Sequence, residues 1–134
     1  MANENILIID DDPDMVEAMR MTLEANGYRV SHAASGEDGL KQVKQLNPDL
    51  IVLDVMMDTT TEGFQVSLTL RSPDPRSEYA AYRHIPILML TAIHTTTSLR
   101  FGPDEVYLPV DDFIDKPVDP DVLLDKVRGL LERV

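Results

Sequence analysis

The sequence predicts an α/β protein, a single domain over residues 1–134 with a doubly wound parallel sheet covered by helices on both faces. Short, purely apolar runs alternate with longer segments in which apolar residues recur every three or four positions. The runs lack the apolar–polar alternation of a half-exposed strand, so both of their faces are expected to be buried. A chain of 134 residues with 43% hydrophobic composition suits one core.

The first strand and helix are predicted at residues 5–9 and from Pro13 onward. Asp12 before Pro13 is typical of a helix N-cap followed by the first helical position. Gly27 is expected to end this helix. Its inner face is predicted to carry Met15, Val16, Met19 and Leu23.

A second strand is predicted at residues 28–32, and a helix follows it. Ser35 is the expected N-cap, and Asn47 with Pro48 ends the helix. The predicted inner face holds Leu40, Val43 and Leu46. The run LIVLD at residues 50–54 is the third strand.

The second half is less regular. A third helix is predicted near Gly63, with Phe64, Val66, Leu68 and Leu70. Residues 72–84 are predicted as an enlarged loop with a helical turn around 79–82. The fourth and fifth strands are ILMLT at 87–91 and DDFID at 111–115. Asp119 and Pro120 start a final helix that carries Val122, Leu123, Val127, Leu130, Leu131 and Val134.

Residues 92–110 do not fit a long regular helix. Gly102, Pro103 and Pro109 interrupt the segment, and each disfavours a helix interior. We therefore expect an atypical fourth-helix region, with at most a short helix over residues 95–101.

Carboxylates follow two of the buried strands. Asp10 and Asp11 end the first strand, and Asp54 ends the third. If those strands are neighbours, three carboxylates meet at the carboxyl edge of the sheet, where such folds bind ligands. Two charges ~4 Å apart repel by about 4 kcal/mol at an effective dielectric near 20, so the group must bind protons or a cation. Oxygen ligands without Cys or His favour Mg²⁺, with Mn²⁺ as the alternative.

Two further strand ends carry groups suited to phosphoryl chemistry. Thr91 places a hydroxyl after the fourth strand, and Lys116 places an ammonium after the fifth. A metal, a hydroxyl and an ammonium around one carboxylate can stabilise a phosphoryl group. Asp54 would then be the nucleophile and form an acyl phosphate.

Composition excludes several classes of function. The net charge of −12 argues against direct nucleic-acid binding, which needs a basic face. No apolar stretch approaches the ~18 residues of a membrane span. The chain has no cysteine, and polar residues 3–5 interrupt any N-terminal apolar segment. Together these features favour an intracellular, cytoplasmic protein.

Four motifs occur in this order along the chain: IIDDDPD at 8–14, PDLIVLDVMM at 48–57, ILMLTA at 87–92 and DDFIDKPV at 111–118. Together they resemble the receiver domain of two-component response regulators, a family similar to CheY. The resemblance covers nearly the whole chain. It implies a five-stranded sheet in the order 2-1-3-4-5 with five helices. It also implies a phosphorylation-activated switch rather than an enzyme acting on an outside substrate.

The resemblance also implies a role for each site residue. Asp54 resembles the phospho-acceptor, which takes its phosphoryl group from a histidine kinase or a phosphotransfer protein. Asp10 and Asp11 resemble the acidic pair that seats Mg²⁺, Asp11 directly and Asp10 through water. The backbone carbonyl of Met56 would be a further ligand.

The remaining roles concern the switch. Thr91 resembles the hydroxyl that turns toward the phosphoryl group, and Lys116, followed by Pro117, resembles the lysine that pairs with it. Phe113 stands at the position of the switch aromatic, which swings inward when Thr91 moves. The rearranged surface would then bind a downstream protein effector. The alternative for Phe113 is an ordinary core or edge aromatic.

The sequence departs from the family pattern in several places. Asp58 stands where a proline is usual, and residues 93–110 lack the usual Ala- and Leu-rich helix. We therefore expect a partner surface unlike the usual dimer face. Met56 and Ile93 are apolar where some receivers have polar side chains that orient the hydrolytic water, which predicts slow self-dephosphorylation.

Two alternatives stay open. A haloacid-dehalogenase-like phosphatase would use Asp10 as nucleophile in Asp10-x-Asp12, but Asp14 replaces the Thr or Val expected there. A phosphorylation-independent interaction module on the same fold would bind its partner equally well without Asp54. The sequence also leaves open whether the chain is a stand-alone receiver or one domain of a longer protein.

Overall fold

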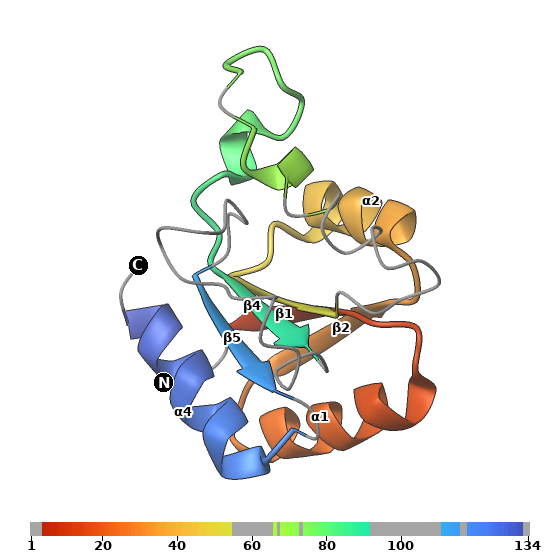
Figure 1. Cartoon of the computed structure of the whole chain (residues 1–134), viewed down its shortest axis with the longest axis vertical. Coiled ribbons are helices and arrows are strands. Elements are labelled where there is room, and N and C mark those ends of the chain that lie inside the picture. Colours follow the sequence, from red (N-terminus) through yellow and green to blue (C-terminus); the bar gives the residue numbers. More distant parts are fainter. Residues whose placement is uncertain are drawn as a thin grey trace, which may run out of the picture.

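The computed structural model describes residues 4–54, 66, 68–72, 74–91, 111–115 and 118–132 of the chain. Within them, five parallel strands form one sheet in the order β2-β1-β3-β4-β5 (Figure 1). This confirms the α/β doubly wound class and the strand order implied by the resemblance. The strands are β1 (Asn5–Ile9), β2 (Arg29–Ala33), β3 (Leu50–Asp54), β4 (Ile87–Thr91) and β5 (Asp112–Asp115).

Helices cover both faces of the sheet. Helices α1 (Pro13–Ala25) and α4 (Pro120–Glu132) lie on one face, and α2 (Gly36–Leu46) lies on the other (Figure 1). Residues 66 and 68–70 are also helical and pack on the α2 side through Val66 and Leu70. Among the described residues, no helix combines the length and apolar character that a membrane crossing needs.

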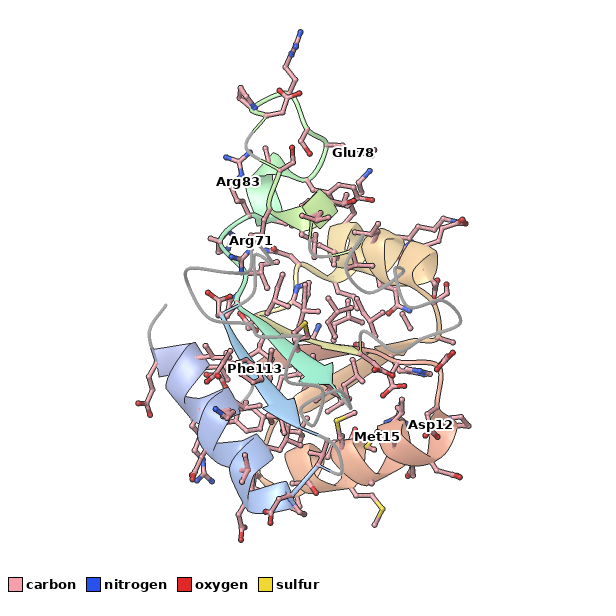
Figure 2. All side chains as sticks on the ribbon, viewed as in Figure 1. Asp12, Met15, Arg71, Glu78, Arg83 and Phe113 are labelled. Atoms are coloured by element: carbon pink, nitrogen blue, oxygen red, sulfur yellow. The ribbon has the colours of Figure 1, made fainter. Side chains whose placement is uncertain are left out.

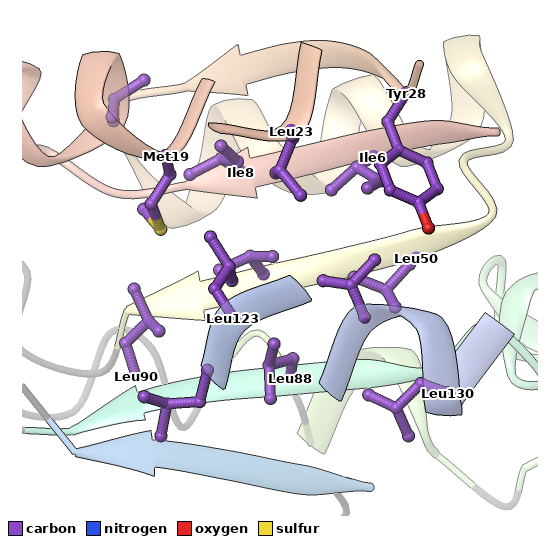
Figure 3. Close-up of a cluster of buried hydrophobic side chains, with 14 residues drawn as sticks. Ile6, Ile8, Met19, Leu23, Tyr28, Leu50, Leu88, Leu90, Leu123 and Leu130 are labelled. Atoms are coloured by element: carbon purple, nitrogen blue, oxygen red, sulfur yellow. The ribbon is translucent and has the colours of Figure 1, made fainter. Parts of the chain in front are cut away.

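Successive strand residues feed two separate cores, as expected for a sheet buried on both sides. In β1, Ile6 and Ile8 face α1 and α4, whereas Leu7 and Ile9 face α2. Figure 3 shows the first core, where α1 and α4 meet over the central strands. Its labelled members are Ile6, Ile8, Met19, Leu23, Tyr28, Leu50, Leu88, Leu90, Leu123 and Leu130.

The predicted helix ends are confirmed. The Asp12 carboxylate accepts hydrogen bonds from the Asp14 and Met15 amides, and the Ser35 hydroxyl accepts one from the Asp38 amide. Helix α1 stops at Ala25, and Gly27 adopts a φ of 92°, which glycine tolerates best. Both caps lie next to strand ends, so they fix where the chain leaves the sheet.

Some predicted boundaries and inner faces were wrong. Strand β2 begins at Arg29 rather than Tyr28, and β5 begins at Asp112 rather than Asp111. Leu46, Leu68 and Val122 are exposed rather than on inner faces. Helical periodicity predicts which side of a helix faces the core. The neighbouring elements decide how many residues at the edge of that side are buried. Gly63, Phe64, Val134 and residues 92–110, for which an atypical fourth-helix region was predicted, lie outside the described residues.

The enlarged loop at 72–84 contains the predicted helical turn, a 3₁₀ helix at Ala80–Tyr82. It is attached to α2 by Lys44, which pairs with Glu78 and lies 4.8 Å from the ring centre of the buried Tyr79. The hydrogen bond that Lys44 Nζ donates to the Glu78 carboxylate raises the pKa of Lys44 above its ordinary value. Figure 2 places Glu78 and Arg83 far from Asp12, at the opposite end of the molecule.

Replacing Gly39 with Ala is expected to destabilise the protein by about 2 kcal/mol. A Cβ at Gly39 would lie 2.5 Å from Ile9 Cδ1 and 2.8 Å from its Cγ1, and the branched Ile9 side chain is fully buried. Gly129→Ala in α4 is the matched control. No heavy atom lies within 4 Å of its added Cβ, so the better helix former should add up to about 1 kcal/mol. Urea denaturation of both variants tests the opposite signs, and equal effects would contradict this packing.

Candidate functional site

The acidic residues of two neighbouring strands meet at one point of the sheet. Strands β1 and β3 pair with Ile9 beside Leu53, so Asp10 and Asp54 leave the sheet side by side. Both are buried, 0% and 1% exposed, whereas Asp11 is exposed. Each of the three offers a carboxylate oxygen, and these oxygens lie within 4.8 Å of one another. The convergence predicted from the sequence is therefore confirmed.

The backbone around Asp10 holds this corner in place. The Asp10 amide donates to the Ala33 carbonyl at 3.0 Å, and Asp10 Oδ1 accepts from the Asp12 amide at 2.9 Å. Asp12 in turn caps α1. Its confirmed role as a cap separates it from the other two aspartates of the run, which belong to the cluster with Asp54.

The donor set fits a hard divalent cation. Three carboxylates within 4.8 Å repel one another by at least about 3.5 kcal/mol per pair at an effective dielectric near 20. A cation removes this penalty, and oxygen-only ligands suit Mg²⁺ or Mn²⁺. The exposed Asp11 leaves the cluster open to solvent on one side, as a partly hydrated ion requires.

The remaining site residues predicted from the sequence are only partly described. Thr91 ends β4, next to β3, and its backbone follows Leu90, the partner of Asp54. Phe113 lies on the edge strand β5 and is 37% exposed. The side chain of Thr91 lies outside the described part of the structure, as do Met56 and Lys116. Their predicted roles stay predictions.

Sequence reasoning missed His32. Its Nε2 lies 2.8 Å from the backbone carbonyl oxygen of Asp10. His32 belongs to none of the sequence motifs, and a single polar residue in a strand usually predicts a side chain that faces solvent. Only the β1–β2 register, which places His32 beside Ile8, could have suggested a contact with the residues after β1.

Comparison with known proteins agrees with this geometry. A family model described as the response regulator receiver domain matches residues 6–128. The transcriptional regulatory protein AfsQ1 of Streptomyces coelicolor is 37% identical over 129 residues, which cover 96% of this chain and 52% of AfsQ1. The DNA-binding dual master transcriptional regulator RpaA of Synechocystis is 39% identical over 128 residues, 96% of this chain and 49% of RpaA.

A solved structure extends the comparison to three dimensions. The receiver domain of the Francisella response regulator 1452 superimposes with a TM-score of 0.80 at 26% identity, covering 98% of both chains. The present chain therefore matches a receiver domain along nearly its whole length, but spans about half the length of the curated relatives it matches.

Proposed function

Because the chain belongs to the receiver domain family of two-component response regulators, we propose that it is switched by transfer of a phosphoryl group to Asp54. The observation that carries this proposal is the buried Asp54 carboxylate within 4.8 Å of the carboxylates of Asp10 and Asp11. Formation of an acyl phosphate requires a carboxylate nucleophile next to a cation-binding site.

In the proposed reaction an Asp54 oxygen bonds to the phosphorus of a phosphohistidine while the phosphorus–nitrogen bond breaks. The electrons of that bond stay on the imidazole, which leaves. Asp10, Asp11, Asp54 and the Met56 carbonyl would hold Mg²⁺, and the ion would neutralise charge on the phosphoryl oxygens. Lys116 would pair with the product. A histidine kinase or a histidine phosphotransfer protein supplies the phosphoryl group.

The switch itself is proposed to run through Thr91 and Phe113. Thr91 turns toward the phosphoryl group, and Phe113 moves inward into the space this leaves. The exposed position of Phe113 on the edge strand supports this direction of movement. The changed surface binds a protein effector in the cytoplasm. The net charge of −12 favours a protein partner over nucleic acid for this domain.

The position of the acyl phosphate tests the proposal against the phosphatase alternative. After treatment with acetyl phosphate and Mg²⁺, borohydride reduces an acyl phosphate, and peptide mapping finds the altered residue. We expect Asp54. Modification of Asp10, or steady release of phosphate from small phosphoesters that Asp10→Asn abolishes and Asp54→Asn retains, would favour the phosphatase.

The phosphorylated form is expected to decay slowly, with a half-life of many minutes or longer. The reason is the apolar character of the Met56 and Ile93 side chains, which carry no strong hydrogen-bonding group to orient a hydrolytic water. Loss of phosphate from the purified phosphoprotein, followed by intact mass, measures the rate. Met56→Asn should shorten the half-life. A wild-type half-life of seconds would contradict this expectation.

A further inference from the structure

We infer that His32 is a positioning residue that sets the geometry of the acidic cluster through the Asp10–Asp11 peptide. The inference rests on the proposed function of that cluster as a cation seat. It concerns a residue on a different strand, which neither the motifs nor the composition indicate.

The contact between His32 and the Asp10 carbonyl lies where the pairing of β1 with β2 ends. The last residue pair of the ladder is Ile9 with Ala33, and the Asp10 amide still donates to the Ala33 carbonyl. Strand β2 then gives way to the Ser35 cap of α2. At this point the imidazole of His32 meets the Asp10 carbonyl oxygen at 2.8 Å. A carbonyl oxygen only accepts, so His32 Nε2 must carry the proton and donate it.

The Asp10 carbonyl belongs to the peptide group that joins Asp10 to Asp11. Because a peptide group is planar, fixing its oxygen fixes the direction in which the chain enters Asp11. Asp10 is then held at three atoms: its amide by Ala33, its carbonyl by His32 and its Oδ1 by the Asp12 amide. Both carboxylates of the pair therefore depend on the orientation that His32 imposes.

His32 is itself anchored from α2. Gln42 Nε2 donates to the His32 carbonyl at 2.7 Å and also lies 3.1 Å from Asp38 Oδ2 in the first turn of the helix. The half-buried imidazole is thus attached to a backbone fixed by a neighbouring element. Preorganisation of this kind lowers the cost of gathering ligands around an ion.

The test compares His32→Leu, which removes the donor, with His32→Gln, which keeps an N–H donor at similar reach. His84→Leu is the matched control, because His84 is exposed and precedes β4 at the opposite end of the sheet. The readouts are the Mg²⁺ dissociation constant by calorimetry and, in metal-free protein, the tautomer of His32 by nitrogen NMR. Urea denaturation without metal monitors folding.

We expect His32→Leu to weaken Mg²⁺ binding about five- to tenfold, with His32→Gln recovering most of this and His84→Leu unchanged. Metal-free wild type should show the proton on Nε2. Unchanged Mg²⁺ affinity in His32→Leu beside normal wild-type binding, or a proton on Nδ1 alone, would overturn the inference and leave the proposed function standing. Equal loss in the Leu and Gln variants together with lowered stability would also overturn it, as a purely structural effect. Absence of Mg²⁺ binding by the wild type would instead remove the proposed function and the inference with it.

Discussion

Replacing Asp10 with Asn is expected to stabilise the metal-free protein by about 1–2 kcal/mol and to abolish most of the stabilisation by Mg²⁺. The change removes one of three clustered charges. Each pair of these charges costs at least about 3.5 kcal/mol before screening by the solvent on the exposed side of the cluster. Asn can still accept the Asp12 amide bond through its Oδ1. In the wild type, Mg²⁺ at about 100 times its dissociation constant should add about 2.7 kcal/mol.

Urea denaturation with EDTA and with Mg²⁺ measures both parts of this prediction. Asp125→Asn on the exposed face of α4 is the control, since it makes the same charge change outside the cluster. Asp125→Asn should change the metal-free stability by no more than a few tenths of a kcal/mol. It should leave the stabilisation by Mg²⁺ unchanged. If Asp10→Asn gains no metal-free stability and Mg²⁺ stabilises it as fully as the wild type, the cluster is not a cation seat.

Replacing Asp111 with Ala is expected to cost about 3 kcal/mol of stability. Asp111 Oδ2 accepts from the Ile87 amide at 2.8 Å and from Arg71 Nη2 at 2.6 Å, and Arg71 also donates to the Ile85 carbonyl at 2.7 Å. Truncation leaves the Ile87 amide and the Arg71 guanidinium without this carboxylate as a partner. Both side chains of the ion pair are largely buried, since Arg71 is 19% exposed and Asp111 is 26% exposed. Figure 2 shows Arg71 near the base of the protruding loop.

The adjacent Asp112 provides a matched control. It pairs with Lys126 at 3.1 Å, and both side chains are about one-third exposed, so Asp112→Ala should cost at most about 1 kcal/mol. Mg²⁺ affinity should be unchanged in both variants, because Asp111 precedes β5 and the cluster lies at the carboxyl ends of the strands. Equal losses of stability in the two variants would contradict the assigned difference in burial.

Much of the fold could be predicted from local patterns. Three apolar runs, at residues 6–9, 50–53 and 87–90, identified β1, β3 and β4, because burial on both faces leaves few polar interruptions. The predicted bounds of all five strands agree with the structure to within one residue. Asp12 and Ser35 were identified as caps because capping depends on residues only two or three positions apart. The convergence of Asp10 and Asp54 followed from a general property of parallel sheets, once β1 and β3 were taken as neighbours.

The features that were missed depend on contacts distant in sequence. His32 reaches Asp10 only through the β1–β2 register and the turn into α2, and Arg71 reaches Asp111 across 40 positions. Neither contact produces a periodic pattern in the sequence from which it could be predicted. The exposure of Leu46 and Leu68 was missed for a related reason, since the covering of a helix face depends on neighbours that periodicity does not identify.

The most direct test of the central claim is the intact mass of the protein after treatment with acetyl phosphate, with and without Mg²⁺, for wild type and Asp54→Asn. We predict one added phosphoryl group on the wild type in the presence of Mg²⁺, almost none without it, and none on the variant. Absence of any addition to the wild type would contradict the proposed switch and favour a module that binds its partner independently of phosphorylation. Equal addition to Asp54→Asn would assign the nucleophile to a different residue.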